Sequence, residues 1–358
     1  MRYFLVFILL SPYFAFCQSY ELVWSDEFDG DKLDTSKWEV MLGDGQSYGL
    51  PSGWGNNELQ FYRRENIEVK NGYLIITAKK ESYGGKSYTS GRIRTKGKGD
   101  WLYGRFEMRA KMPIGRGLWP AFWMLPSSTK YGGWAASGEI DIMEYIGHEP
   151  NTVHGTLHYG GPWPQNVHKG GSYTLPSGTF ADDFHTFTLE WEPKRISWFV
   201  DGRVFRRTNE WYSTNGPYPA PFDVPFHILI NLAVGGNWPG APDASTQFPQ
   251  QLVIDYVRVY QIPSAVEKGG QEDPGAFEVY PNPCNQQTVI RIDLAHPQEL
   301  TLAVFDIHGR CLDKLFNGFL KAGTHQWVWG ADHNPSGLYF VRLESSESRI
   351  IRRIVLLK

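Results

Sequence analysis

Short segments of alternating apolar and polar residues, bounded by Gly, Pro, Asn or Asp, fill the chain from about residue 20 to 262. Strand side chains point to alternate faces, so this alternation predicts strands with one buried face. No stretch of ten or more residues combines a strong helical period with helix caps. The pattern therefore predicts an all-β sandwich or barrel. The clearest strands are YLIITAKK (73–80), RFEMRAKM (105–112), FHTFTLEW (184–191), RISWFVDG (195–202), FHILINLAV (226–234) and LVIDYVRVY (252–260).

The composition changes at IPSAVEKGGQEDPGA (262–276), which is rich in Gly, Pro and charged residues. Such a segment is typical of an exposed linker, which we place at 263–275. Further alternating segments follow in 276–358 and predict a second, smaller β-sandwich. Within the first region, Asn71-Gly72 and Asp201-Gly202 predict tight hairpin turns.

Three carboxylates stand close together in GEIDIMEYIG (138–147). In a regular strand, Glu139, Asp141 and position 143 would share one face, but position 143 is Met. A β-bulge, with Met143 as the extra residue, would return Glu144 to the face of the other two acids.

This arrangement of acids indicates glycoside chemistry. Two Glu side chains leaning over the shorter Asp could approach the separation of about 5 Å that a retaining glycosidase needs. The alternative is a solvated strand edge. The apolar residues Ile140, Ile142 and Tyr145 argue against an edge, because acids alternating with apolar residues imply one buried face and one charged face.

Charge and composition narrow the class of ligand. The formal net charge is −3 and 20% of residues are charged, so neither nucleic acid nor an acidic membrane is expected as a partner. The 14 Trp and 19 Tyr exceed what a core requires, and their flat amphipathic rings suit sugars, although many would be ordinary core or surface residues.

The N-terminus, MRYFLVFILLSPYFAFCQ, predicts a signal peptide at 1–17, with cleavage after Cys17. A lipoprotein with Cys17 modified is the alternative, and bulky Phe16 disfavours it. Export would permit a disulfide between Cys284 and Cys311, and the sequence leaves that pairing open.

Taken together, the segments of 20–262 resemble the laminarinase-like branch of glycoside hydrolase family 16. The resemblance implies a β-jelly roll of two antiparallel sheets with a substrate cleft across the concave face. It also implies the extra strand residue, which mixed-linkage glucanases of the family typically lack. The segments are LVWSDEFDG (22–30), WGNNELQFY (54–62), SGRIRTKG (90–97), GRFEMRAKMPIGRGLWPAFWMLP (104–126), GEIDIMEYIG (138–147), VHGTLHY (153–159), NLAVGGNWPG (231–240) and VIDYVRVYQ (253–261).

By this resemblance Glu139 is the nucleophile, Glu144 the general acid/base and Asp141 the carboxylate between them. The tryptophans are expected to line the sugar groove or, alternatively, to pack in the core. His158 is expected near the acid/base, and Asn57 and Arg92 are expected to bind sugar hydroxyls or else to cap a turn and pair with a surface acid. The expected substrate-binding residues are Asn57, Arg92, Trp119, Trp123, Trp134, His158 and Trp238.

No cofactor is expected for catalysis, and no His or Cys cluster has the sequence spacing of a zinc site. The resemblance implies one structural calcium ion. Its expected ligands are Glu27, the Gly72 carbonyl and Asp255, all of which offer the hard oxygen atoms that calcium prefers.

The tail from about 276 resembles a type IX secretion sorting domain, and a carbohydrate-binding module is the alternative. The resemblance implies a secreted or cell-surface protein that engages the type IX secretion machinery and then loses its tail. The matching segments are VYPNPC (279–284), VFDIHGR (304–310), PSGLYFVRL (335–343) and the basic, apolar end RIIRRIVLLK (349–358).

The leading hypothesis is a secreted, monomeric endo-β-1,3-glucanase that cuts laminarin-type glucans with retention of configuration. An agarase or carrageenase of the same bulged type is the first alternative, for which more basic residues around the cleft would be expected. A non-catalytic β-glucan-binding protein would be expected to lack the carboxylates. A transglycosylase on the same scaffold also remains open.

Overall fold

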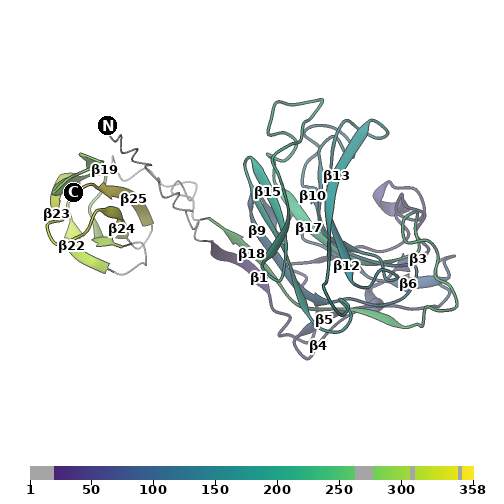
Figure 1. Ribbon diagram of the computed structural model, residues 1–358. Coiled ribbons are helices and arrows are strands. Elements are labelled where there is room, and N and C mark those ends of the chain that lie inside the picture. Colours follow the sequence, from purple (N-terminus) through teal and green to yellow (C-terminus); the bar gives the residue numbers. More distant parts are fainter. Residues whose placement is uncertain (1–19, 263–276, 307–310, 346–348) are drawn as a thin grey trace, which may run out of the picture. The chain divides into compact units, whose positions relative to one another are not determined.

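The computed structural model describes residues 20–262, 277–306, 311–345 and 349–358 (Figure 1). The predicted signal peptide and the predicted linker lie outside these residues. The chain divides into two compact units, with the division between Ile262 and Pro263. Among the described residues, none of the helices has the length and apolar character needed to cross a membrane.

The first sheet of the larger unit has the strand order β16-β15-β14-β9-β18-β5-β4, with β1 paired to β18, and every pairing is antiparallel. Its strands are β1 (Glu21–Asp26), β4 (Ile67–Lys70), β5 (Tyr73–Ala78), β9 (Gly104–Lys111), β14 (His185–Glu192), β15 (Arg195–Val200), β16 (Arg203–Thr208) and β18 (Gln250–Gln261).

The second sheet has the order β13-β12-β11-β10-β17-β7-β2, with β8 paired to β17, and it is antiparallel as well. Its strands are β2 (Glu39–Val40), β7 (Arg92–Arg94), β8 (Asp100–Trp101), β10 (Leu118–Pro126), β11 (Glu139–Tyr145), β12 (Thr152–Gly160), β13 (Asn166–Thr174) and β17 (Phe226–Val234). A small parallel pair, β3 (Gln60–Tyr62) and β6 (Tyr88–Ser90), lies outside both sheets.

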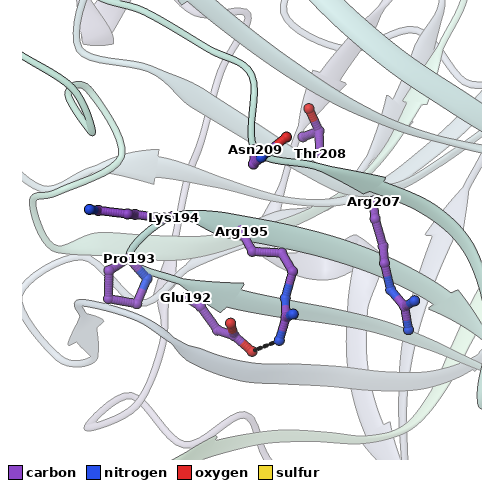
Figure 2. Close-up of a pocket in the computed structure, with 7 residues that line it drawn as sticks. All are labelled: Glu192, Pro193, Lys194, Arg195, Arg207, Thr208 and Asn209. Atoms are coloured by element: carbon purple, nitrogen blue, oxygen red, sulfur yellow. Dashed lines mark hydrogen bonds and ion pairs between the residues drawn. The ribbon is translucent and has the colours of Figure 1, made fainter. Parts of the chain in front are cut away.

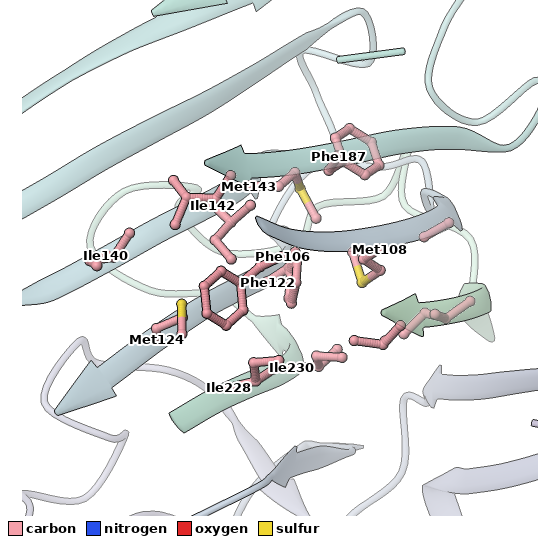
Figure 3. Close-up of a cluster of buried hydrophobic side chains, with 14 of the residues drawn as sticks. Phe106, Met108, Phe122, Met124, Ile140, Ile142, Met143, Phe187, Ile228 and Ile230 are labelled. Carbon is pink, nitrogen blue, oxygen red and sulfur yellow. The ribbon is translucent and has the colours of Figure 1, made fainter. Parts of the chain in front are cut away.

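The core lies between the two sheets (Figure 3). Phe106 and Met108 of the first sheet belong to the same buried cluster as Phe122, Met124 and Ile140 of the second. Each fully buried large apolar side chain contributes about 1.5–3 kcal/mol, so this layer holds the sandwich together. Helices in the described residues are limited to two 3₁₀ turns, η1 (Gln46–Tyr48) and η2 (Arg64–Asn66), which confirms the all-β prediction.

The two predicted hairpin turns are confirmed. Asn71 and Gly72 have φ of 55° and 78° between β4 and β5, and Asp201 and Gly202 have φ of 48° and 74° between β15 and β16. Two consecutive positive φ values define the turn whose twist matches that of the flanking strands, and Asn-Gly and Asp-Gly adopt it at little cost.

The smaller unit is a second, small β-sandwich with its own buried cluster, which includes Ile290, Leu302, Trp329 and Val341. Cys284 is buried, Cys311 is exposed, and both are free thiols. The two sheets of the smaller unit have the strand orders β19-β20-β23 and β22-β21-β24-β25. The strands are β19 (Phe277–Tyr280), β20 (Gln287–Leu294), β21 (Gln298–Phe305), β22 (Cys311–Leu320), β23 (Gly323–Gly330), β24 (Gly337–Ser345) and β25 (Arg349–Leu356).

Candidate active site

A bulge in β11 puts the three acids on one face of the second sheet. Asp141 pairs with Trp123 of β10, yet Met143 pairs with the next residue, Phe122, so Ile142 has no partner on that side. The sequence pattern correctly predicted a bulge, but the pairing places it at Ile142–Met143 rather than at Met143 alone. Both bulged side chains are buried, while Glu144 returns to the face of Asp141.

His158 joins the acids from the neighbouring strand, β12, where it pairs directly with Glu139. Its Nε2 atom lies 3.3 Å from Oδ2 of Asp141 and 3.8 Å from Oε1 of Glu139. Burial disfavours the imidazolium, but the contact with the Asp141 carboxylate and the other nearby negative charges outweigh it and raise the pKa of His158 to about 9. His158 is therefore a cation that partly neutralises the acids.

The two glutamates differ in the groups that stabilise their ionised forms. Burial, followed by the charge of Asp141, raises the pKa of Glu139 to about 7, and the same two causes raise the pKa of Glu144 well above its usual range. Glu139 has the nearer cation, His158, and accepts a hydrogen bond of 2.7 Å from Nε1 of Trp134. Glu144 accepts a longer bond, 3.3 Å, from Nε1 of Trp119. Glu139 therefore ionises first and Glu144 retains its proton.

Two pairs of tryptophans bracket the acids. The rings of Trp119 and Trp238 are 5.7 Å apart at the end of the site nearer Glu144. Trp134, beside Glu139, has its ring 6.5 Å from that of Trp163, whose backbone N–H donates to the Trp134 carbonyl at 2.8 Å. Trp134, Trp163 and Trp238 are exposed and Trp119 is half-buried, so these rings can offer stacking faces to sugars, as core aromatics cannot.

Trp123 and Arg92 form a third part of this face. The Arg92 guanidinium lies 4.9 Å from the ring centroid of Trp123 and 4.4 Å from that of Trp54, so it is stacked against both indoles. Arg92 is only 5% exposed. The buried positive charge of Arg92 favours the ionised form of the Glu139 carboxylate.

Asn57 lies in a loop that meets the loop of Trp238. Its side-chain amide donates to Oδ1 of Asn237 at 2.8 Å, and the Asn237 N–H donates to the Asn56 carbonyl. All seven predicted substrate-binding residues are thus on the strands and loops of the face that carries the acids. The four tryptophans and His158 among them each contact one of the acids, a second tryptophan or a neighbouring polar side chain of this face.

Trp163 is a residue that the sequence analysis missed. It is 71% exposed and stands in the loop between β12 and β13. Its flanking residues, Pro162 and Pro164, marked a rigid loop in the sequence, but nothing in the linear pattern placed that loop beside Trp134.

The predicted calcium residues lie apart from the acids, on segments of the first sheet. Glu27 accepts from Arg258 with both carboxylate oxygens, at 2.9 and 2.8 Å, and Asp255 accepts from Arg109 at 2.5 Å. As these side chains stand, they do not fit a calcium ion, because three of the four carboxylate oxygens bind guanidinium groups.

One group of side chains has metal-like spacing that the sequence pattern did not reveal. The candidate ligand atoms of Glu139, Asp141 and His158 all lie within 4.8 Å of one another. A histidine ligand must be neutral, whereas His158 has a raised pKa. The group is therefore better suited to proton and charge control than to holding a cation.

A hollow of about 550 Å³ lies on the other sheet, where β14 and β15 turn and β16 ends (Figure 2). An ion pair of 2.7 Å joins Glu192 and Arg195 there. This hollow contains none of the predicted site residues. Its lining residues are Glu192, Pro193, Lys194, Arg195, Arg207, Thr208 and Asn209.

The two-sheet fold and the acidic, tryptophan-lined face define a glycoside hydrolase. Residues 55–258 match the model of the glycosyl hydrolases family 16, and the chain belongs to that family. Residues 278–357 match a secretion system C-terminal sorting domain, which indicates secretion or display at the cell surface.

Similar proteins support this assignment. The glucan endo-1,3-beta-glucosidase A1 of Niallia circulans is 48% identical over 261 residues, which cover 67% of this chain and 38% of that protein. A beta-glucanase of Rhodothermus marinus is 47% identical, covering 68% of this chain and 85% of that one. The catalytic domain of a Thermotoga petrophila laminarinase has a TM-score of 0.62 at 42% identity, covering 69% of this chain and all of that one.

Proposed function

We propose that this protein is a secreted endo-acting glucanase that hydrolyses β-1,3-glucosidic bonds of laminarin-type glucans with retention of configuration. The observation that carries the proposal is the bulged strand β11, which gathers two glutamates of different acidity between tryptophan pairs. The relatives named as 1,3-glucanases and laminarinases support the choice of β-1,3-glucan.

In the first chemical step, the ionised Glu139 attacks the anomeric carbon and forms a glycosyl ester. The bond from that carbon to the leaving oxygen breaks, and Glu144 gives its proton to this oxygen. The hydrogen bond from Trp134 and the charge of His158 hold Glu139 ionised before the attack.

In the second step, Glu139 is part of the ester and no longer carries a negative charge. Glu144 is now ionised and takes a proton from water, whose oxygen attacks the anomeric carbon and releases the Glu139 carboxylate. Asp141 lies between the glutamates with its Oδ2 atom 3.3 Å from Nε2 of His158, so the pair keeps a counter-charge in place through both steps.

The tryptophans supply stacking faces for the glucan on either side of the reacting bond. We assign Trp119, Trp123, Trp134 and Trp238 to this role, with Asn57 and Arg92 as hydrogen-bonding or charge-bearing supports. Of the alternatives named above, a carrageenase would need cationic groups for the sulfate groups of its substrate, and Arg92 is already enclosed by indole rings.

A product assay tests the proposal. The purified protein is incubated with laminarin, mixed-linkage glucan, agarose and carrageenan, and Glu139→Ser serves as the matched inactive variant. We expect laminarin to be cut into oligomers by the natural protein and not by Glu139→Ser. Cleavage of a galactan with laminarin left intact would refute the substrate, and an active Glu139→Ser would refute the nucleophile.

The proposal extends to export and assembly. We propose cleavage of residues 1–17, engagement of the type IX machinery by the C-terminal unit, removal of that unit on export, and a monomeric product. The mass of the secreted protein in solution tests all four, and retention of 278–357 would instead favour a binding module.

The structural calcium ion stays a prediction. For Glu27, Gly72 and Asp255 to bind it, the ion pairs to Arg258 and Arg109 must open. A ligand that binds only the folded state raises Tm. A calcium-dependent rise in Tm that Glu27→Gln abolishes would support the site, and equal Tm values in calcium and in EGTA would refute it.

A further inference from the structure

The hollow of about 550 Å³ lies on the first sheet, whereas the acids stand on the second (Figure 2). It forms where the turn between β14 and β15 meets the end of β16. Its volume falls within the range of small-molecule sites, about 300–1,000 Å³. Such sites are mostly apolar, but the lining here is polar and charged. The hollow therefore suits a hydrophilic ligand.

Two cations of the lining have no partner. Of its four charged side chains, Arg195 and Glu192 form an ion pair of 2.7 Å. The side chains of Lys194 and Arg207 make no ion pair or hydrogen bond within the described part of the chain, and both are exposed. The hollow thus presents two positive charges that its own acid does not neutralise.

The acids that flank the hollow do not neutralise these two cations either. Glu190, on β14, accepts from Arg105 at 3.1 Å, and Glu210, just beyond β16, is paired with Lys169. A carboxylate that already has a basic partner gains little from a second one in exposed surroundings. An anion from solution would therefore meet uncompensated positive charge.

Neutral groups for a sugar border the cations. Asn209 is exposed, and its side-chain amide, which makes no hydrogen bond to another described residue, can both donate and accept. The Tyr218 hydroxyl donates to the backbone carbonyls of Lys194 and Asn209, at 3.4 and 3.2 Å, so this ring stands at the edge of the hollow. The ring is 45% exposed and packs 5.4 Å from the buried Trp211. A half-exposed aromatic ring offers a sugar a stacking surface.

We propose that this hollow binds an anionic polysaccharide chain, one that bears carboxylate or sulfate groups, at a site separate from the glucan cleft. Lys194 and Arg207 bind the anionic groups, since charge-assisted hydrogen bonds are the stronger ones. The Asn209 amide and the Tyr218 ring bind the sugar unit itself. Because the hollow and the acids lie on different sheets, a chain held here leaves the cleft open to glucan.

The test is a calorimetric titration of the full chain carrying Glu139→Ser, so that glucan is bound without being cut. The titrants are hexasaccharides of mannuronate, of carrageenan and of β-1,3-linked glucose. We expect an anionic hexamer to bind even when the glucan hexamer is saturating, because the glucan occupies only the cleft. The two anionic hexamers distinguish carboxylate from sulfate as the recognised group, and polyglutamate tests whether a sugar is needed.

Lys194→Gln combined with Arg207→Gln removes the two unpaired cations. The matched control is Lys80→Gln with Arg203→Gln, which makes the same change of charge at two exposed cations outside the hollow. We expect the first pair to weaken binding of the anionic hexamer about fivefold or more, and the control pair less than about twofold. Tyr218→Ala should weaken it about threefold or more. The effect of the charge changes should shrink as salt is added, because salt screens exposed charges.

Four results would overturn the proposal. They are no binding of either anionic hexamer, equal weakening by the two double variants, displacement of the anionic hexamer by glucan, and binding of polyglutamate as tight as that of the sugars. The Tm of each variant and its binding of the glucan hexamer show that the fold is intact.

Discussion

Replacing Trp134 by Phe isolates one hydrogen bond to the nucleophile. The variant keeps an aromatic ring but loses the N–H that donates to Oε2 of Glu139 at 2.7 Å. Hydrogen bonds to charged groups contribute about 1.5–3 kcal/mol. Trp134 is 45% exposed, so water replaces part of the bond and the lower figure applies. At 1.36 kcal/mol per unit, the pKa of Glu139 should rise by about one unit.

The sign of the effect follows from the role of Glu139. The bond stabilises the ionised carboxylate, so its loss raises the pKa from about 7. The nucleophile must be ionised, and kcat/KM therefore rises with pH through this pKa. In Trp134→Phe the rising limb of the kcat/KM–pH profile should move to higher pH by about one pH unit. Well below the pKa, the variant should be about tenfold slower, and the difference should shrink as pH rises.

The assay is kcat/KM on laminarin from about pH 5 to 9, measured as reducing ends. Trp163→Phe is the control, because this exposed indole neighbours Trp134 and makes no hydrogen bond to an acid among the described residues. Its rising limb should coincide with that of the natural protein. A uniform loss in Trp134→Phe, with no movement of the rising limb, would refute the reasoning.

Three further outcomes are expected. Trp163→Ala should raise KM for long glucans about two- to twelvefold with kcat kept, as loss of one stacking face worth about 0.5–1.5 kcal/mol requires; unchanged KM would exclude sugar contact. Asp141→Asn should lower the pKa of His158 below about 9 in an NMR titration, because its strongest anionic partner is gone; an unmoved titration would contradict the pairing. Deleting Met143 should remove the bulge but leave Glu144 two residues after Asp141, on the same face of a regular strand, so we expect hydrolysis of laminarin to remain measurable; complete loss of activity in a folded variant would show that the bulge itself is needed to position Glu144.

Much of this protein could be predicted from local sequence patterns. Period-two alternation identified strands such as Gly104–Lys111, and Asn-Gly and Asp-Gly identified two hairpins. Counting faces along β11 predicted the bulge that unites Glu139 with Glu144. These features are local: they depend on the pleat and on turn geometry, both of which act over a few residues.

Which distant segments of the chain lie side by side was decided only by the tertiary structure. The sequence placed His158 near the acid/base, and the structure adds that it pairs with Glu139 and lies 3.3 Å from Oδ2 of Asp141. The fold also brought Trp163, in the loop between β12 and β13, to Trp134. Alternation tells which face of a strand a side chain occupies, but not which strand will lie beside it. That choice comes from packing two whole sheets against each other, so the acids could be predicted from the local pattern, whereas the contacts that each acid makes with other strands and loops could not.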